Sequence, residues 1–204
     1  MTGPPAISDD AEVVAQSLEQ PDVFAVLYDR HASEIHRYAL RRLGESAAED
    51  IMAETFLIAF RNRRRYDPAR RSARPWLYGI AAKLIGGHRR REERALRALA
   101  RTGVDPLAES WSARSDDRIA VQAPLAGALA SLSPGDRDVL LLVAWADLGY
   151  QEVAEALRIP LGTVRSRLNR ARRKVRTALI ADPAFVSGAS DGSDETELTA
   201  SWMS

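Results

Sequence analysis

A dense run of basic residues near the C-terminal end of the sequence is its clearest chemical feature. Seven arginine or lysine side chains and no acidic one lie between residues 165 and 176. An apolar stripe at helical spacing accompanies them: Val164, Leu168, Ala171, Val175 and Leu179. Such a helix can place its polar side chains on base edges in the DNA major groove while its arginines meet phosphates. The candidate DNA-contacting residues are Thr163, Arg165, Ser166, Arg167, Asn169, Arg170 and Arg173.

Two other interpretations of this helix are a solvated surface helix and a helix lying on anionic lipid. A run of seven cations without a single acid argues against ordinary solvation. The polar face also lacks the aromatic side chains that anchor a helix in a membrane interface. DNA binding is therefore the favoured interpretation.

A second candidate site is an acidic and apolar helix over residues 47–61. Asp50 and Glu54 are four residues apart and share one face of it. They could form a metal site, a solvated face or a docking patch for another protein. A metal site is disfavoured because no third ligand lies at suitable spacing. From the residues alone, a solvated face is the favoured interpretation.

A third candidate site combines a basic loop over residues 63–75 with the helix that follows it. Its cations and aromatic rings are of the types that hold a splayed single strand or a flipped base. The loop supplies arginines for phosphate contacts: Arg63, Arg64, Arg65, Arg70, Arg71 and Arg74. The aromatic and cationic candidates around it are Tyr66, Trp76, Tyr78, Lys83, His88, Arg89, Arg90 and Arg91. Trp76 borders the apolar stripe of its helix, so we expect its ring to be buried in the core rather than stacked on a base.

No pattern in the sequence predicts catalysis, a metal centre or a cofactor. The chain has no cysteine, no phosphate-binding G-x-x-x-x-G-K and no H-E-x-x-H. His31, His36 and His88 do not form a ligand cluster, and we expect His31 and His36 at a helix surface or core edge. We therefore expect no enzymatic activity.

The rest of the chain predicts an all-α fold with two small helical domains. Helical periodicity dominates, with one helix over residues 22–43 ended by Gly44 and another from Pro75 towards Arg94. Residues 150–179 read as a helix-turn-helix, with Pro160 at the start of the second helix. The expected organisation is an acidic segment at 1–21, a domain at 22–95, a linker at 96–122, a domain at 123–181 and an acidic disordered tail at 182–204.

Charge and targeting signals agree with this organisation. Sixteen basic and ten acidic residues lie in 22–95, and nine basic and five acidic ones in 123–181, whereas both ends of the chain carry acids only. Two basic domains favour a polyanionic partner, with nucleic acid ahead of a membrane surface. The N-terminus lacks signal-peptide features, and no apolar run is long enough to span a bilayer. We expect a cytoplasmic protein.

Three segments of the chain resemble bacterial RNA polymerase sigma factors of the extracytoplasmic-function (ECF) class. AEDIMAETFLIAFR (48–61) is similar to region 2.2 of that family, PWLYGIAAKLIGGHRRR (75–91) to regions 2.3 and 2.4, and SLSPGDRDVLLLVAWADLGYQEVAEALRIPLGTVRSRLNRARRKVR to region 4. The resemblance implies a non-enzymatic subunit that binds core polymerase and directs promoter-specific initiation at stress-response or envelope-signal genes, under the control of an anti-sigma factor.

The resemblance also assigns expected roles to the three candidate sites. Region 4 would read the minus-thirty-five element and contact the polymerase β flap. Region 2.2 would grip the β′ clamp helices through Asp50, Ala53, Glu54 and Leu57. The minus-ten element would be recognised and melted by Arg71, Arg74, Trp76, Tyr78, Lys83, His88, Arg89 and Arg90.

Four positions depart from the family pattern. Ala53 replaces a frequent glutamine and Lys83 a frequent asparagine, which puts one polymerase contact and the reader of a minus-ten base in doubt. Gly149 replaces the usual helix-capping serine or threonine, at a cost of only a few tenths of a kcal/mol. Pro160 replaces a frequent serine that could contact a phosphate.

Two alternatives concern function and regulation. A conventional helix-turn-helix regulator would need only residues 150–179 and would bind duplex DNA without polymerase, which leaves the basic loop and the acidic helix without a task. The acidic tail could fold over the basic helix and weaken free DNA binding, although a simple solvated tail is the favoured interpretation.

Overall fold

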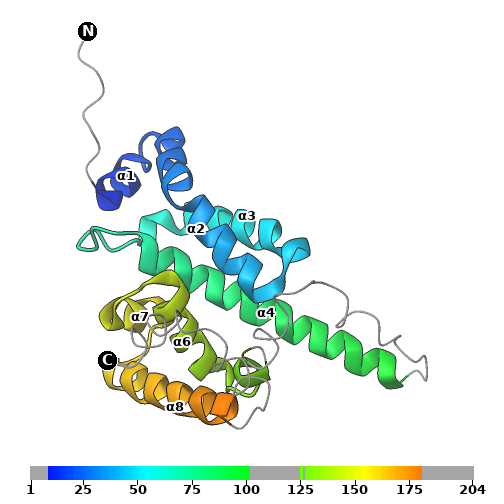
Figure 1. The fold of residues 1–204 in the computed structure, drawn as a ribbon. Helices are drawn as coiled ribbons and strands as arrows, with labels where there is room; N and C mark the ends of the chain where they lie inside the picture. The colour runs from blue at the N-terminus through cyan, green and yellow to red at the C-terminus, as the bar shows by residue number, and fades with distance from the viewer. Residues whose placement is uncertain (1–8, 102–124, 126, 181–204) are drawn as a thin grey trace, which may run out of the picture. The chain divides into compact units, whose positions relative to one another are not determined.

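A computed structural model describes residues 9–101, 125 and 127–180, and these form helices and connecting turns without any strand (Figure 1). This agrees with the predicted all-α class. In the described part, residues up to 101 and 141–165 belong to one compact unit, while 127–140 and 166–180 belong to a second. Residues 1–8, most of the predicted linker and the predicted acidic tail lie outside the described residues. None of the described helices is long and apolar enough to cross a membrane.

Three long helices form the body of the first unit: α2 (Ala25–Leu43), α3 (Glu45–Asn62) and α4 (Arg74–Arg101). They lie side by side in Figure 1 and pack against one another in each pairwise combination. Their inward faces bury large apolar side chains that contribute about 1.5–3 kcal/mol each on burial. The most enclosed of these are Leu27, Ile35, Tyr38, Leu77, Tyr78 and Ile85.

Gly44 separates α2 from α3. Its backbone has φ +82°, a left-handed conformation that L side chains rarely adopt, and its N–H donates to the Leu40 carbonyl. The glycine therefore ends α2 at the position that the sequence predicts, and α3 begins directly after it.

The N-terminal segment contains a packed helix, α1 (Asp10–Gln16), followed by the 3₁₀ turn η1 (Pro21–Phe24). The Asp9 carboxylate caps α1 by accepting the Glu12 N–H at 3.1 Å. Val13 and Val14 are buried, and so is Asp10. Residues 10–16 are thus part of the folded unit, a feature that the net acidity of the segment concealed.

The basic loop begins with a short 3₁₀ turn, η2 (Arg63–Arg65), and ends where α4 starts at Arg74. Helix α4 continues without a break through Gly86 and Gly87. Each of these glycines disfavours a helix by about 1 kcal/mol relative to alanine, yet the pair does not interrupt α4.

The C-terminal helices are α6 (Pro134–Ala146), α7 (Tyr150–Leu157) and α8 (Leu161–Ile180). Gly149 precedes α7, and its N–H donates to the Glu152 carboxylate at 2.8 Å, the half of a capping box that needs no hydroxyl at the N-cap. Arg158 takes a left-handed conformation (φ 53°) in the turn between α7 and α8. Pro160 lies one residue before α8, and its carbonyl accepts the N–H groups of Thr163 and Val164. The predicted helix-turn-helix segment is therefore present.

Candidate nucleic-acid interface

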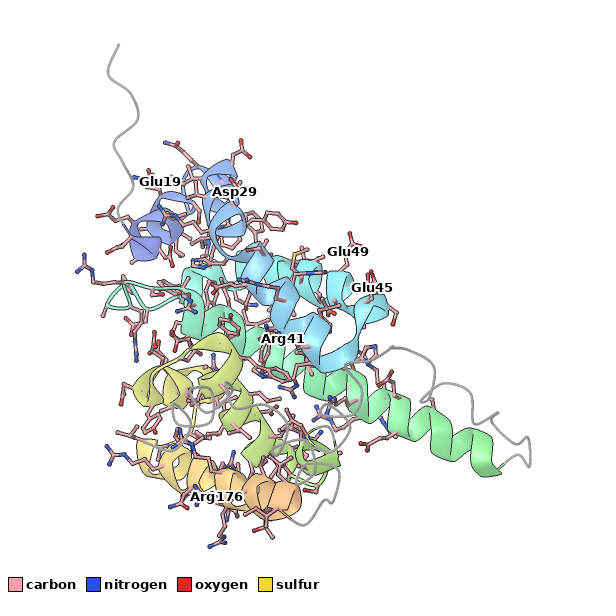
Figure 2. The ribbon with its side chains drawn as sticks, viewed as in Figure 1. Glu19, Asp29, Arg41, Glu45, Glu49 and Arg176 are labelled. Carbon is pink, nitrogen blue, oxygen red and sulfur yellow. The ribbon has the colours of Figure 1, made fainter. Side chains whose placement is uncertain are left out.

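Helix α8 presents its polar residues on an exposed face, as its apolar stripe predicts. Val164, Leu168 and Ala171 are buried. The exposed candidates are Arg165, Ser166, Asn169, Arg170 and Arg173, while Thr163 and Arg167 are half-buried. Figure 2 shows Arg176 projecting from the same helix near its C-terminal end.

Two of the α8 arginines lie against the N-terminal end of α6. Arg170 donates Nε to Asp136 Oδ2 at 3.0 Å and Nη2 to Oδ1 at 3.1 Å, a bidentate pair on a residue that is only 3% exposed. Burial would raise the pKa of Asp136, but the hydrogen bonds from Arg170 and Ser133 outweigh it and lower that pKa. The Arg167 guanidinium packs against Gly135, where a Cβ would come within 2.7 Å of Nη1. Sequence reasoning missed these contacts because α6 and α8 are far apart in the chain.

Helix α3 presents an acidic and apolar face to solvent. Asp50, Ala53, Glu54 and Leu57 are all exposed and follow the i, i+3, i+4, i+7 spacing of one helix face. Leu57 is 46% exposed, a large apolar side chain with acidic neighbours. Figure 2 shows two further acids, Glu45 and Glu49, projecting from the beginning of α3. The structure thus brings the four predicted docking residues together on one surface.

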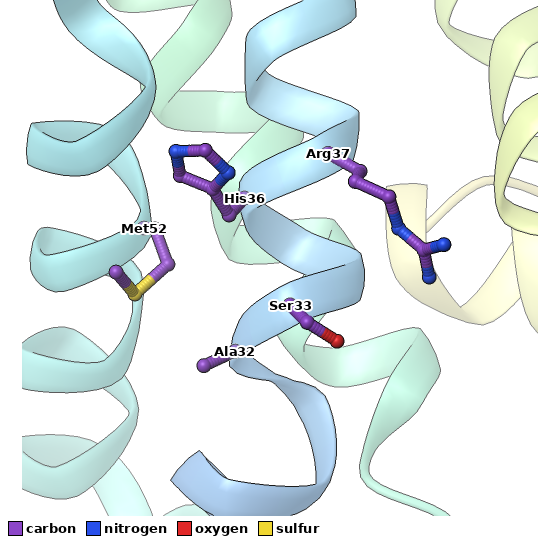
Figure 3. Close-up of a pocket in the computed structure, with 5 residues that line it drawn as sticks. All are labelled: Ala32, Ser33, His36, Arg37 and Met52. Carbon is purple, nitrogen blue, oxygen red and sulfur yellow. The ribbon is translucent and has the colours of Figure 1, made fainter.

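A shallow depression lies beside this face, between α2 and α3. Ala32, Ser33, His36, Arg37 and Met52 line it, and Figure 3 shows His36 and Met52 reaching towards each other from the two helices. Its lining is small, partly apolar and open to solvent, which suits a protein surface better than an enclosed small-molecule site.

The basic loop has a defined internal structure. The Tyr66 hydroxyl donates to the Arg70 carbonyl at 2.6 Å, and the Tyr66 ring lies 5.0 Å from that of Trp76. Asp67 accepts the Ala69 N–H at 3.0 Å and Arg70 Nε at 3.2 Å. Trp76 is half-buried, and its ring packs at a tilt of 54° against that of Tyr66, which is also half-buried.

The arginines of the loop differ in their exposure. The Arg71 side chain is 84% exposed, and Arg64 and Arg65 are exposed as well. Arg63 instead lies over the Phe60 ring at 3.9 Å, and its guanidinium donates to the Ser17 and Phe60 carbonyls. Arg70 is exposed as well, but its guanidinium pairs with Asp67 and Glu155.

The remaining minus-ten candidates lie on α4 and differ in their exposure to solvent. Lys83 and Arg90 are exposed. His88 lies 3.4 Å from Glu92, and Arg89 donates to the Arg42 carbonyl at 2.7 Å. Tyr78 is only 2% exposed and packs edge-on against Tyr38 at 5.3 Å, and burial raises its pKa to about 12. The Tyr78 ring therefore belongs to the core, and sequence reasoning did not separate it from the surface aromatics.

Behind the loop lies a buried chain of charges that the sequence did not reveal. The Asp10 carboxylate accepts His31 Nε2 at 2.9 Å, and His31 Nδ1 meets Glu34 at 2.7 Å. Glu34 in turn pairs with Arg74 Nε at 3.1 Å. His31 is 8% exposed, so it lies deeper than the predicted core edge.

The ionisation of this chain follows from its geometry. Burial would lower the pKa of His31, but hydrogen bonds to Asp10 and Glu34 outweigh it and raise that pKa to about 9. Burial likewise opposes ionisation of Asp10, while donors from His31, Ala73 and Arg30 lower its pKa to about 2. At neutral pH His31 is an imidazolium that donates from both ring nitrogens to carboxylates.

Two parts of the chain match known protein families. Residues 27–95 match the family Sigma-70 region 2, and residues 122–175 match Sigma-70, region 4. Together they define a transcription initiation factor of the sigma-70 type, in which a region 2 and a region 4 act on polymerase and promoter DNA.

Individual proteins of similar sequence are sigma factors of the ECF class. The chain is 32% identical over 170 residues to the ECF RNA polymerase sigma factor SigL of Mycobacterium tuberculosis, covering 83% of this chain and 96% of that protein. It is 29% identical over 188 residues to the ECF sigma factor SigK of Mycobacterium bovis, covering 88% and 98%. A solved structure of CnrH, in complex with the cytosolic domain of CnrY, matches at a TM-score of 0.61 and 26% identity, covering 86% and 99%.

The chain belongs to the ECF family of RNA polymerase sigma factors. It binds core RNA polymerase and promoter DNA and directs promoter-specific initiation of transcription. The conventional regulator is thereby set aside, because that alternative leaves region 2 unexplained.

Proposed function

We propose that the α3 face formed by Asp50, Ala53, Glu54 and Leu57 docks on the β′ clamp helices of core polymerase. The observation that carries this assignment is the exposure of all four residues on one face of the region 2 match. Leu57 supplies exposed apolar area at the C-terminal end of this face, three residues beyond Glu54, and burial of such area against a partner favours binding. The two acids steer the patch towards a basic partner.

A pair of leucine variants tests this docking face. Leu57→Ser should weaken binding of core polymerase about tenfold, as measured with fluorescently labelled protein. Leu40→Ser is the matched control, because Leu40 is also an exposed leucine (37%) but lies on α2, outside the patch. Equal affinities for the two variants would refute the assignment.

For promoter reading, we propose that the exposed face of α8 binds the minus-thirty-five element. Arg165, Asn169 and Arg173 are its best-placed contacts, and Ser166 extends the same face. Arg170 positions the helix through Asp136 while keeping part of its guanidinium exposed (48% of the side chain). Arg167 acts at the edge of this face, beside Gly135.

The minus-ten element is assigned to the basic loop and the exposed side of α4. Arg64, Arg65 and Arg71 supply phosphate contacts, and the Tyr66–Trp76 pair offers a surface on which an unpaired base can stack. Lys83 and Arg90 extend the positive surface along α4. Tyr78 is omitted from these contacts, because its ring packs in the core.

Control by an anti-sigma factor completes the proposed function. CnrH was solved with the cytosolic domain of CnrY bound, and the present chain shares its fold over nearly its whole length. An anti-sigma polypeptide that covers the α3 face would block the polymerase patch. We accordingly place the action of this non-enzymatic factor in the cytoplasm, with core polymerase. Leu57→Ser should weaken binding of such an anti-sigma factor by about the same factor as binding of core polymerase. A change in only one of the two affinities would show that the two partners use different surfaces.

A further inference from the structure

Helix α1 lies before the region 2 match and holds the basic loop at both of its ends. At the end of the loop, the Ala73 N–H donates to Asp10 Oδ2 at 2.8 Å, and the Asp10 N–H donates to the Arg71 carbonyl at 3.0 Å. At its beginning, Arg63 Nε donates to the Ser17 carbonyl, just after α1, at 3.2 Å. The loop is therefore anchored to a segment that precedes it by 46 to 63 residues in the sequence.

Asp10 is the centre of this arrangement. Its residue is 6% exposed, and its two carboxylate oxygens accept from the Ala73 N–H, from His31 and from Arg30, the last at 2.9 Å. Each donor comes from a different place: the end of the loop and two positions on α2. Charge-assisted hydrogen bonds of this kind fix orientation as well as contribute energy. The carboxylate thus fixes the end of the loop relative to α2.

The chain of charges continues from Asp10 to the first residue of α4. His31 joins Asp10 to Glu34, and Glu34 holds Arg74 Nε at 3.1 Å. Ala73 and Arg74, the residue before α4 and its first residue, are thereby tied to the same network through two carboxylates. Free rotation of the loop about the start of α4 would break both ties.

We propose that Asp10 is a positioning residue for promoter recognition: α1 clasps the 63–73 loop in the shape that presents its exposed arginines and the Tyr66–Trp76 pair to the minus-ten strand. The inference rests on the proposed role of that loop. Asp10 itself does not face the DNA-contacting surface, because its carboxylate is enclosed by protein donors. Its effect is on the shape of the loop and on the discrimination that this shape permits.

The test is the variant Asp10→Asn in the full-length chain. The amide keeps one oxygen acceptor but turns an N–H₂ donor towards a group that is itself a donor, so at least one tie is lost. Hydrogen exchange at residues 70–73 should accelerate about tenfold, the change expected from loss of a charge-assisted hydrogen bond. Open-complex formation on duplex promoter should fall about fivefold or more, with weaker discrimination among minus-ten sequence variants, while binding of core polymerase stays within about twofold.

Asp29→Asn is the matched control. It makes the same carboxylate-to-amide change at an exposed position on α2 (Figure 2) and should alter none of these readouts. Should Asp10→Asn fail to fold cooperatively, Asp9→Asn decides instead. The carboxylate of Asp9 lies 3.2 Å from Nε of the exposed Arg71, and loss of this ion pair should accelerate exchange at the loop end by about twofold.

The double variant Arg64→Ala/Arg65→Ala separates this inference from the function on which it rests. One outcome is that the double variant reduces initiation while Asp10→Asn leaves hydrogen exchange in the loop and minus-ten discrimination unchanged. That result would refute positioning of the loop by Asp10 but would leave the proposed role of the loop intact. If the arginine variant initiates as well as the parent chain, the proposed role of the loop fails first. Faster loop exchange in Asp10→Asn with unchanged discrimination would also overturn the positioning role.

Discussion

Raising the pH should weaken the first unit through His31. The pKa of His31 is raised from 6.5 to about 9 in the folded protein, because Asp10 and Glu34 hold the imidazolium. A group whose pKa is raised on folding stabilises the folded state fully below its ordinary pKa, and that stabilisation is lost as the pH rises through the folded value. The loss should therefore run from about pH 6.5 to about pH 9.

The size of this loss follows from the two pKa values. A rise from 6.5 to about 9 corresponds to roughly 3 kcal/mol of preferential stabilisation of the charged form. The His31 side chain retains 10% of its exposure, so solvent screening reduces the effect, and we expect about 2 kcal/mol. Asp10 adds no slope in this window, because its lowered pKa affects stability only in acid, below its ordinary value of 3.8.

Urea unfolding between pH 6 and pH 9.5 measures the effect. The free energy of unfolding of the parent chain should fall by about 2 kcal/mol more than that of His31→Gln over this range. His36→Gln is the matched control, since His36 lies on the same helix but lines the open depression beside Met52. It should keep the slope of the parent chain. A His31 ring that titrates near 6.5 by NMR, or equal slopes in all three proteins, would refute the reasoning.

Three further predictions concern other parts of the fold. Gly44→Ala should lower the free energy of unfolding by about 1 kcal/mol, because φ +82° is strained for alanine; thermal unfolding checks this, and an unchanged midpoint would speak against it. Arg165→Ala and Arg173→Ala should each weaken duplex promoter binding and reduce the slope of log affinity against log salt by about one, as titrations at several salt concentrations will show. Arg170→Ala should destabilise the chain by roughly 1–3 kcal/mol, because it leaves the Asp136 carboxylate buried without its partner, and Asp136→Asn in the same background should restore part of that loss.

Apolar periodicity and helix-ending residues predicted the features that depend only on neighbouring residues in the sequence. Gly44 ends α2 because of its own backbone freedom. The apolar stripe of α8 identifies its buried side, and the four-residue spacing of Asp50 and Glu54 identifies a shared face of α3. In each case the information lies within one or two helical turns, which is the range over which sequence patterns report structure.

The features that escaped prediction join residues far apart in the chain. Asp10, His31, Glu34 and Ala73 meet only after α1, α2 and the start of α4 have packed, so no spacing rule brings them together. The helix α1 did carry a signal, the Asp9 cap followed by a glutamate three residues later, but the acidity of the segment drew attention to its charge.

Aromatic residues show the same limit. Tyr78 and Trp76 lie two residues apart on one helix, yet the first is buried against Tyr38 and the second is half-buried beside Tyr66. Composition alone groups them as candidate base-stacking side chains. Their separation depends on which neighbouring helix covers each ring.

The most direct test of the account is run-off transcription with purified core polymerase and a promoter library, with and without this chain. We expect new transcripts whose templates share two motifs, near minus ten and minus thirty-five. At a limiting concentration of the chain, Leu57→Ser should reduce their yield and Leu40→Ser should not. Failure to initiate anywhere, together with retained binding to duplex DNA in the absence of polymerase, would contradict the central claim that this chain acts as a sigma factor.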